Sequence, residues 1–337
     1  MESIQRVMNA YSIYPANITQ ITDRLFRIQD GQGDYALKRS LMTHETAVSF
    51  ENTYHLASSR NLDAVLPVYL THNRKLHVEM DGHIYYLTPW VQTDEHRGRK
   101  DHIKGIYRHL GDIHARTKRK KDLAQEDAWK RFDTYRDYCQ STHRELTSFI
   151  GQFEKKRYMS PVELLVCTHF KELEAACHIG SKRTEQLVDS AKKDGTWSWS
   201  LCHGNLRMSH TLQTAADPFF INWENSRFDN AVSDLTGLYS RETLYHNHPG
   251  SWFIELFGSY MQRNRLSETE LHLLVIHMLD PSHYMKLVKQ YTGKADKGRM
   301  MDYIPPLQRY YRRVLFGLEF SQHIEQEFET ISFQEDD

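Results

Sequence analysis

Residues 196–210 read TWSWSLCHGNLRMSH, and residues 218–228 read PFFINWENSRF. Each stretch interrupts the helical spacing around it and predicts a short strand followed by a loop. From about residue 100 to the end, the other segments place apolar residues at three- and four-residue steps, which is typical of amphipathic helices. These predicted helices span residues 103–117, 128–156, 162–193, 250–264, 268–291 and 307–328. The back of the chain is therefore helical, with two strand-loops inserted late.

The front of the chain predicts a small antiparallel sheet with one helix packed on it. Thr43 to Arg60 has a helical period, with Thr43 as the N-cap. Asp81-Gly82 predicts the turn of a hairpin. The predicted strands span residues 16–22, 23–29, 35–39, 64–71, 75–81 and 83–91. We therefore expect an α+β, bilobal fold with an N-lobe at 1–92 and a helical C-lobe at 93–337, which together form one domain.

Composition excludes several classes of protein. Lys and Arg total 43 and Asp and Glu total 44, so the formal charge of −1 does not indicate a nucleic-acid-binding surface. The four cysteines form no C-x-x-C pair, which favours a reduced, intracellular protein. The N-terminus lacks a basic region followed by an apolar run, and no apolar stretch is long enough to span a bilayer. We expect a soluble, unexported protein.

Several short motifs occur in an order that resembles a known superfamily. They are Ala36-Leu37-Lys38, Glu51, LTPW at 87–90, LGDIHART at 110–117, His203-Gly204-x-Leu206, Ile221-x-Trp223-Glu224 and FDNAVSDL at 228–235. In order and spacing the chain is similar to aminoglycoside phosphotransferase-like and choline kinase-like enzymes over about residues 15–320. Within that superfamily it most resembles the spore-coat CotS group, and in particular its YsxE-type sporulation proteins. The resemblance implies a protein-kinase-like fold.

The resemblance also implies roles for individual residues. Lys38 takes the place of the lysine that reaches the nucleotide phosphates, and Glu51 that of the glutamate that holds this lysine by an ion pair. Arg207 is a further cation for the phosphates, and the family's His203 is retained. Asn205, however, stands where the family has its catalytic aspartate, and an amide oxygen has no useful basicity.

The expected metal ligands have changed as well. Asn222 occupies the family's metal-binding aspartate position, and His210 occupies that of an asparagine which supplies a second oxygen. Mg²⁺ prefers oxygen ligands, usually with one or two carboxylates among them. Glu224 lies nearby in sequence as a possible substitute. The resemblance gives Asp234 a structural role in bracing the catalytic loop.

Three other features are interpreted without a special function. The turn between the first two strands, at 21–24, contains no glycine, so it is not suited to close over phosphates. The Gly-rich DGQGD at 30–34 is interpreted as a tight β-turn. The basic run at 116–121 is interpreted as a solvated loop at a helix end, and the twenty histidines show no metal-binding spacing.

Two functions stay open from the sequence. The favoured one is a catalytically impaired, kinase-like protein, a pseudokinase, that acts as a structural or assembly component of the spore coat. The resemblance then implies spore-coat proteins as partners, synthesis in the mother-cell cytoplasm and a final place in the coat. The alternative is an active ATP-dependent small-molecule phosphotransferase with an atypical metal site. If a cofactor binds, we expect ATP with weak or no Mg²⁺ binding.

Overall fold

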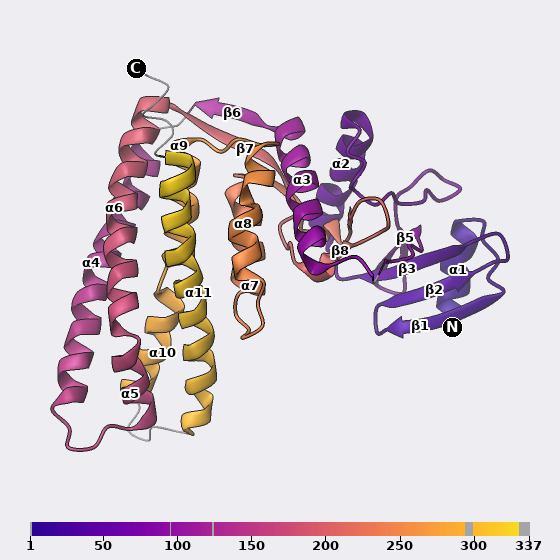
Figure 1. Ribbon diagram of the computed structural model, residues 1–337. Helices are drawn as coiled ribbons and strands as arrows, with labels where there is room; N and C mark the ends of the chain where they lie inside the picture. Colours follow the sequence, from indigo (N-terminus) through magenta and orange to yellow (C-terminus); the bar gives the residue numbers. More distant parts are fainter. Residues whose placement is uncertain (1, 95, 123–124, 294–298, 330–337) are drawn as a thin grey trace. The chain divides into compact units, whose positions relative to one another are not determined.

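The computed structural model describes residues 2–94, 96–122, 125–293 and 299–329, without the side chains of 125–131 and 133. These residues form two compact units. The first unit comprises the chain up to Lys118 together with Ser200–Asp229, and the second comprises Arg119–Trp199 and the chain from Asn230 onward (Figure 1). These units divide the chain at other points than the expected lobes do. The boundary at residue 92 stays a prediction.

The first unit is built on a five-stranded antiparallel sheet with the order β1-β2-β3-β5-β4. Its strands are β1 (Asn17–Thr22), β2 (Leu25–Gln29), β3 (Asp34–Ser40), β4 (Val78–Met80) and β5 (His83–Pro89). Helix α1 (Glu2–Ala10), which the sequence analysis did not predict, packs on this sheet. Val7 and Met8 of this helix share a core with Ile28, Leu37 and Leu87 of the strands. The small predicted sheet is therefore present.

The turn chemistry of the sequence explains how these elements begin and end. Thr43 caps α2 (His44–Arg60), and its hydroxyl accepts from the N–H of Thr46 in a capping box. Asp81 and Gly82 both have positive φ, 51° and 73°, which a tight hairpin between β4 and β5 requires. Residues 64–71, by contrast, do not form the predicted strand. Only Val65 forms an isolated bridge there, to Phe220.

The rest of the first unit consists of α3 (Arg99–Thr117) and a series of short elements. The end of β7 (Thr196–Cys202) pairs with β10 (Arg227–Asp229). Between these strands lie η1 (Met208–His210), the β8–β9 hairpin (Thr211–Leu212 and Phe219–Phe220) and η2 (Trp223–Asn225). The two stretches that interrupt the helical pattern therefore do form strands and loops, as predicted.

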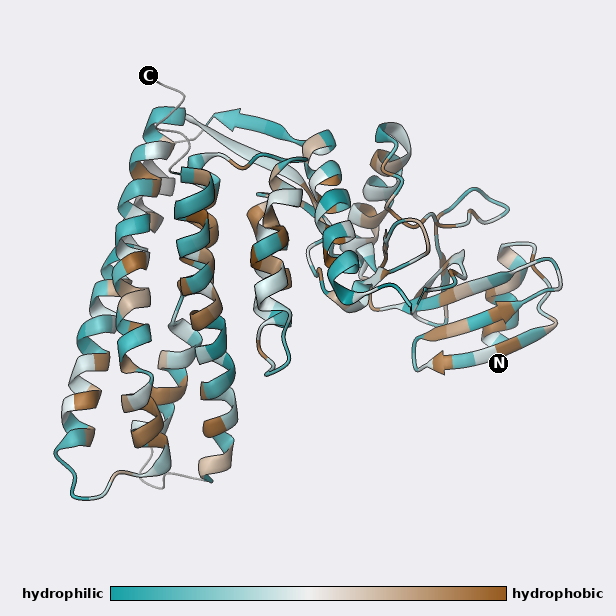
Figure 2. Ribbon diagram, viewed as in Figure 1, coloured by the Kyte–Doolittle hydropathy of each residue, from teal (hydrophilic) through white to brown (hydrophobic). Residues whose placement is uncertain are grey.

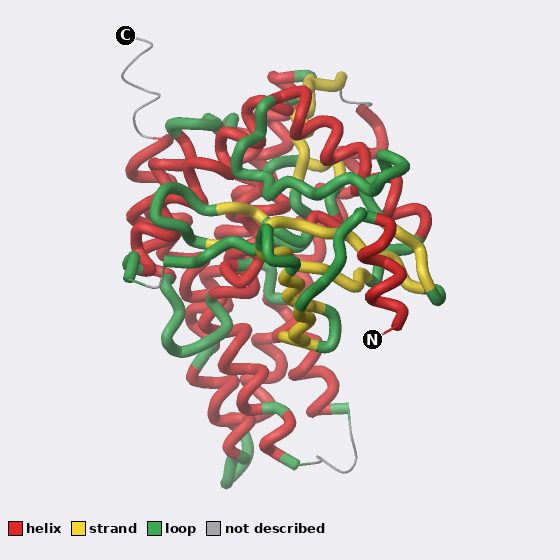
Figure 3. The backbone as a smooth tube through the Cα atoms, turned by 90° about the vertical axis from the view of Figure 1, so that its right-hand side faces the viewer, coloured by secondary structure: helices red, strands yellow, loops and turns green. Residues whose placement is uncertain are grey.

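The second unit is mainly helical. Helix α6 (Phe170–Asp194) packs against α4 (Gln125–Glu154), α9 (Glu268–Leu279) and α11 (Ile304–Ile324). Figure 1 shows α4, α6 and α11 as long helices, and Figure 3 shows that much of the backbone is helical. Hydrophobic and hydrophilic residues alternate along α4 and α6, as expected of amphipathic helices (Figure 2). The remaining helical elements are α5 (Pro161–Thr168), α7 (Val232–Glu242), α8 (Gly250–Met261), α10 (Ser282–Thr292), η3 (Met300–Asp302) and η4 (Glu325–Glu329).

Three sequence interpretations of this unit were wrong in detail. The predicted helix at 162–193 is divided at His169 into α5 and α6. The predicted helix at 268–291 is broken where Pro281 follows α9, because proline cannot continue a helix from the preceding turn. The basic run is not simply a loop, since Arg119–Asp122 form the exposed strand β6, which pairs with the first part of β7.

None of the described helices is long and apolar enough to cross a membrane.

Candidate functional site

Lys38 lies in the middle of the sheet of the first unit. On β3 it stands opposite Leu25 of β2 and Tyr86 of β5. Its ammonium group donates to the amide oxygen Oδ1 of Asn222 and lies 3.6 Å from Oε1 of Glu224. The side chains of Lys38 and Glu224 are only 20% and 14% exposed. The structure therefore brings three predicted site residues together around one ammonium group, and we call Lys38, Asn222 and Glu224 the lysine cluster.

Aromatic side chains surround the carboxylate of this cluster. The Tyr86 hydroxyl donates to Oε1 of Glu224 at 2.9 Å. The rings of Tyr54 and Tyr86 both pack against that of Phe50, with centroids 4.7 and 4.9 Å away. Burial, and then the charge of Glu224, raise the pKa of both tyrosines, so both hydroxyls stay protonated. The carboxylate thus has a lasting donor besides Lys38.

Burial has a larger effect on the pKa of Lys38 than its ion pair with Glu224 has. Burial lowers the pKa of its ammonium group, the charge of Glu224 raises it in part, and the charge of Arg24 lowers it further. Arg24 lies in the glycine-free turn between β1 and β2. The lack of glycine in this turn was part of the prediction, but the effect of Arg24 on Lys38 was not.

The expected ion pair between Lys38 and Glu51 is not formed. Glu51 lies instead 3.5 Å from Nδ1 of His77, and its side chain is 40% exposed. The phase of α2 explains this, because the helix buries Ala47, Phe50, Thr53 and Ala57, and Glu51 lies outside that stripe. Glu224 takes the place at the ammonium group that the sequence analysis gave to Glu51.

The segment that carries Asn222 has an unusual backbone. Asn222 has φ 66° and ψ 51°, a left-handed conformation that asparagine tolerates better than most residues. Trp223 after it is fully buried and donates from its indole nitrogen to the carbonyl of Phe220. Further on, the hydroxyl of Thr53 on α2 donates to that of Ser226 at 2.7 Å. These contacts fix the segment between α2 and the β8–β9 hairpin.

The loop at 203–205 is held by backbone contacts. Gly204 has φ +75°, and a Cβ atom there would lie 2.0 Å from the carbonyl oxygen of Asn225. Nε2 of the fully buried His203 donates to the carbonyl of Ile221 at 2.7 Å, while its Nδ1 accepts from the N–H of Asn205. The histidine therefore joins the two predicted loops, and its catalytic role stays a prediction.

His210 is also tied to this loop. Its Nδ1 donates to the backbone carbonyl of Asn205 at 2.8 Å. Burial, and then the neighbouring His203, lower its pKa to about 4, so the ring is neutral at pH 7. Its backbone carbonyl accepts from the N–H of Ile221. A neutral imidazole in this place offers at most one nitrogen to a ligand.

Asn205 and Arg207 do not join the lysine cluster. Asn205 is half-buried, and Arg207 is exposed. Asp234 lies in the second unit, buried in the first turn of α7. Its role in bracing the loop stays a prediction.

The donors in the lysine cluster fit Mg²⁺ poorly. They comprise one carboxylate and one amide oxygen, and Lys38 contacts both. Mg²⁺ usually keeps near-octahedral geometry with one or two carboxylates, and a lysine ammonium at the same oxygens would repel it. We therefore derive no chemical step through a metal here. What the cluster can do is hold a buried cation and fix β3 to the Asn222 segment.

Comparisons with known proteins identify the fold. No protein-family model matches the chain, and no curated protein does so either. A crystal structure of an aminoglycoside phosphotransferase from Alicyclobacillus acidocaldarius is similar, with a TM-score of 0.70 at 17% identity, over 97% of this chain and 96% of that one. The microcompartment-associated aminopropanol kinase follows, with a TM-score of 0.55 at 12% identity, over 95% and 97% of the two chains.

A spectinomycin phosphotransferase, solved with ADP and spectinomycin, has a TM-score of 0.53 at 12% identity, over 96% of this chain and 99% of that one. At these identities the likeness shows the fold alone. The chain has the kinase-like, aminoglycoside phosphotransferase-like fold, with a small antiparallel sheet and a mostly helical remainder. The predicted fold class is thereby confirmed.

Proposed function

We propose that this chain is a kinase-fold protein whose phosphoryl transfer is impaired. The observation that carries the proposal is the lysine cluster. The ammonium group that would face the phosphates of a nucleotide is bound to Asn222 and Glu224. A phosphate group would have to compete with a carboxylate that is already in place and hydrogen-bonded to Tyr86. The cluster thus neutralises the cation on which nucleotide binding would depend.

The base position supports the same proposal. Asn205 carries an amide that cannot accept a proton from a substrate hydroxyl at neutral pH. General-base assistance contributes roughly 10²- to 10⁴-fold to a rate, so its loss alone leaves a slow enzyme. Combined with a poor metal site, the loss lowers transfer further, because both the nucleophile and the developing charge go without stabilisation.

A second candidate is an active small-molecule phosphotransferase, and one observation favours it. Glu224 places a carboxylate next to Asn222, where a displaced metal ligand would be needed. For this function Lys38 has to leave the carboxylate when ATP binds. The two candidates therefore differ in whether a divalent metal can replace the ammonium group at Glu224.

Calorimetry with ATP separates these candidates when it is done with and without Mg²⁺ or Mn²⁺. The impaired protein is expected to bind ATP weakly or not at all, with no gain from metal, and to transfer no phosphate to water or to a panel of amino alcohols and aminoglycosides. Metal-dependent ATP turnover that disappears in Glu224→Gln would overturn the proposal in favour of the active enzyme. Lys38→Met serves as the control for nucleotide bound at this site.

A double variant that should gain activity provides a second test of the proposed impairment. Asn205→Asp with Asn222→Asp restores a base and a charged metal ligand on the same backbone. We expect this double variant to hydrolyse ATP with metal at a rate at least tenfold above the unaltered protein. The double alanine variant at the same two positions is the matched control and should show no gain.

The cellular role we propose is that of a structural or assembly component of the spore coat. It is supported by the sequence resemblance to the CotS group, carried by the Ala36-Leu37-Lys38, His203-Gly204 and Ile221-x-Trp223-Glu224 motifs. Spore-coat proteins would be its partners, and the mother-cell cytoplasm its place of synthesis. A fluorescent fusion in a spore-forming bacterium should gather at the forming coat. Diffuse fluorescence throughout sporulation would contradict this role.

A further inference from the structure

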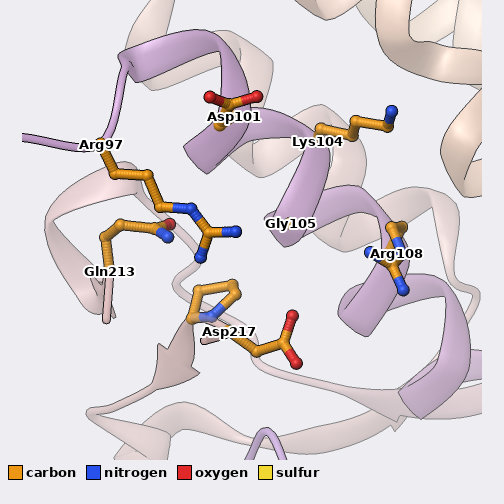
Figure 4. Close-up of a pocket in the computed structure, with 8 residues that line it drawn as sticks. Arg97, Asp101, Lys104, Gly105, Arg108, Gln213 and Asp217 are labelled. Atoms are coloured by element: carbon orange, nitrogen blue, oxygen red, sulfur yellow. The ribbon is translucent and has the colours of Figure 1, made fainter. Parts of the chain in front are cut away.

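A pocket of about 200 Å³ lies in the first unit, beside the first half of α3 (Figure 4). Asp101, Lys104, Gly105 and Arg108 line it from the helix at positions i, i+3, i+4 and i+7, which form one helical face. The opposite wall is formed by Gln213, Asp217 and Pro218, which belong to the loop between β8 and β9 or lie at its ends. Arg97, just before the helix, completes the lining.

The loop wall is held in place by Arg97. The guanidinium Nη1 of this residue donates to the backbone carbonyls of Thr214, Ala215 and Ala216. At the other end of the loop, α3 approaches so closely that a Cβ atom on Gly105 would lie 2.9 Å from Cδ of Pro218. The loop wall of the pocket is therefore tied to Arg97 at one end and lies close against α3 at the other.

Gln213, which lines this pocket, carries a buried polar group without a partner among the described residues. Gln213 is only 8% exposed, and its amide nitrogen donates to the carbonyl of Thr214 at 3.0 Å. Because that carbonyl can only accept, the orientation of the amide is fixed, and Oε1 has no hydrogen-bond partner in the described part of the chain. Figure 4 shows the amide turned toward the guanidinium of Arg97. A buried acceptor without a partner needs a donor to satisfy it, and a ligand in the pocket is one source of that donor.

The charges of the lining favour an anion. Three cations, Arg97, Lys104 and Arg108, outnumber two acids, Asp101 and Asp217. Nε2 of His109 lies 2.9 Å from the carboxylate of Asp217, a close contact that lacks hydrogen-bond geometry. This contact, followed by the charges of Arg108 and Arg97, lowers the pKa of Asp217. Arg108 and Lys104, by contrast, form no ion pair with any described residue, and guanidinium groups bind phosphate in a forked geometry.

We propose that this pocket binds a small phosphate monoester that also carries a hydroxyl group. Arg108 and the remaining N–H groups of Arg97 hold the phosphate, and the hydroxyl donates to Oε1 of Gln213. The volume lies below the range of about 300–1,000 Å³ that suits drug-sized ligands, so the ligand is a small metabolite rather than a nucleotide. No residue of the pocket belongs to the lysine cluster, and the site does not require phosphoryl transfer.

Glycerol 3-phosphate, methyl phosphate and glycerol are the probes, and calorimetry at low salt is the measurement. We expect glycerol 3-phosphate to bind best, because it offers both groups, and glycerol not to bind. Arg108→Gln should weaken binding of both phosphate esters at least tenfold, the effect of losing a hydrogen bond to a charged group. Gln213→Met should leave methyl phosphate unchanged and reduce the preference for glycerol 3-phosphate about three- to tenfold.

Arg60→Gln is the matched control, since this arginine is exposed at the end of α2 and lines no part of the pocket. Its affinities should equal those of the unaltered protein, and circular dichroism should show that all three variants are folded. Equal affinities in Arg108→Gln and Arg60→Gln would overturn the phosphate site. An unchanged preference in Gln213→Met would overturn the assignment of the hydroxyl.

Discussion

Replacing both charged members of the lysine cluster should cost much less than the two single replacements together. In Lys38→Met the carboxylate of Glu224 keeps the Tyr86 hydroxyl as its one close polar partner among the described residues, and in Glu224→Gln the buried ammonium loses its counter-charge. At the observed 3.6 Å, an effective dielectric constant of about 20 gives an attraction of roughly 4–5 kcal/mol. Because both groups are partly exposed, we expect a coupling energy of about 2 kcal/mol.

A double-mutant cycle measures this coupling. Urea unfolding of the unaltered protein, Lys38→Met, Glu224→Gln and the double variant gives the four free energies, and hydrogen exchange of β3 and β5 reports on the first unit alone. The ion pair between Arg6 and Asp81 is the control in the same unit. It is 3.8 Å long and about half exposed, so its coupling should stay below about 0.5 kcal/mol.

The result that refutes the reasoning is a coupling in the lysine cluster no larger than in the Arg6–Asp81 pair. In that case Asn222 alone would hold the ammonium group, and the carboxylate would be available to a metal. Such an outcome would also weaken the proposed impairment of transfer. The cycle therefore tests the central contact without any need for a substrate.

Two further predictions concern pH and backbone strain. Burial lowers the pKa values of His210 and His169 to about 4, so the unfolded chain takes up these protons first as the pH falls. Stability should therefore decline between about pH 6.5 and pH 4, by about 1–2 kcal/mol for each group because solvent screens part of the effect, and urea unfolding across that range measures the decline. A flat profile would contradict this. Gly204→Ala should destabilise the protein by more than about 3 kcal/mol in the same assay, because its Cβ would collide with the Asn225 carbonyl. Gly31→Ala, with a similar φ but no atom within 4 Å of its Cβ, should cost only about 1 kcal/mol, and equal losses would refute the role of the collision.

Local chemistry explains which parts of the fold could be predicted from the sequence. The N-cap Thr43 and the Asp81-Gly82 turn are decided by residues within a few positions of each other, so their signals stand in the sequence. The 64–71 segment has a strand-like composition, but in the structure Val65 meets only Phe220, far along the chain. A contact between such distant segments leaves no pattern in the local sequence from which it could be predicted.

The residues of the site could likewise be predicted only in part. The positions of Asn222 and Glu224 followed from motif order, while the partner of Lys38 did not, because it depends on the phase of α2. Tyr86 could not be found from the predicted hairpin at 81–82, because that turn sets the register of β5 against β4 and not against β3, which carries Lys38. The cation at Arg24 and the pocket beside α3 depend on side-chain directions, which spacing alone does not fix.

The contacts of His203 hold the two loops of the site together without the side chains at 205 and 222. The two loops are joined through the imidazole of His203, the carbonyl of Ile221 and the backbone of His210, and none of these contacts involves the side chain at 205 or 222. Aspartate, moreover, tolerates the left-handed conformation at 222 about as well as asparagine does. Substitutions at these two positions can therefore change the chemical groups at the site while the contacts that join the two loops stay in place.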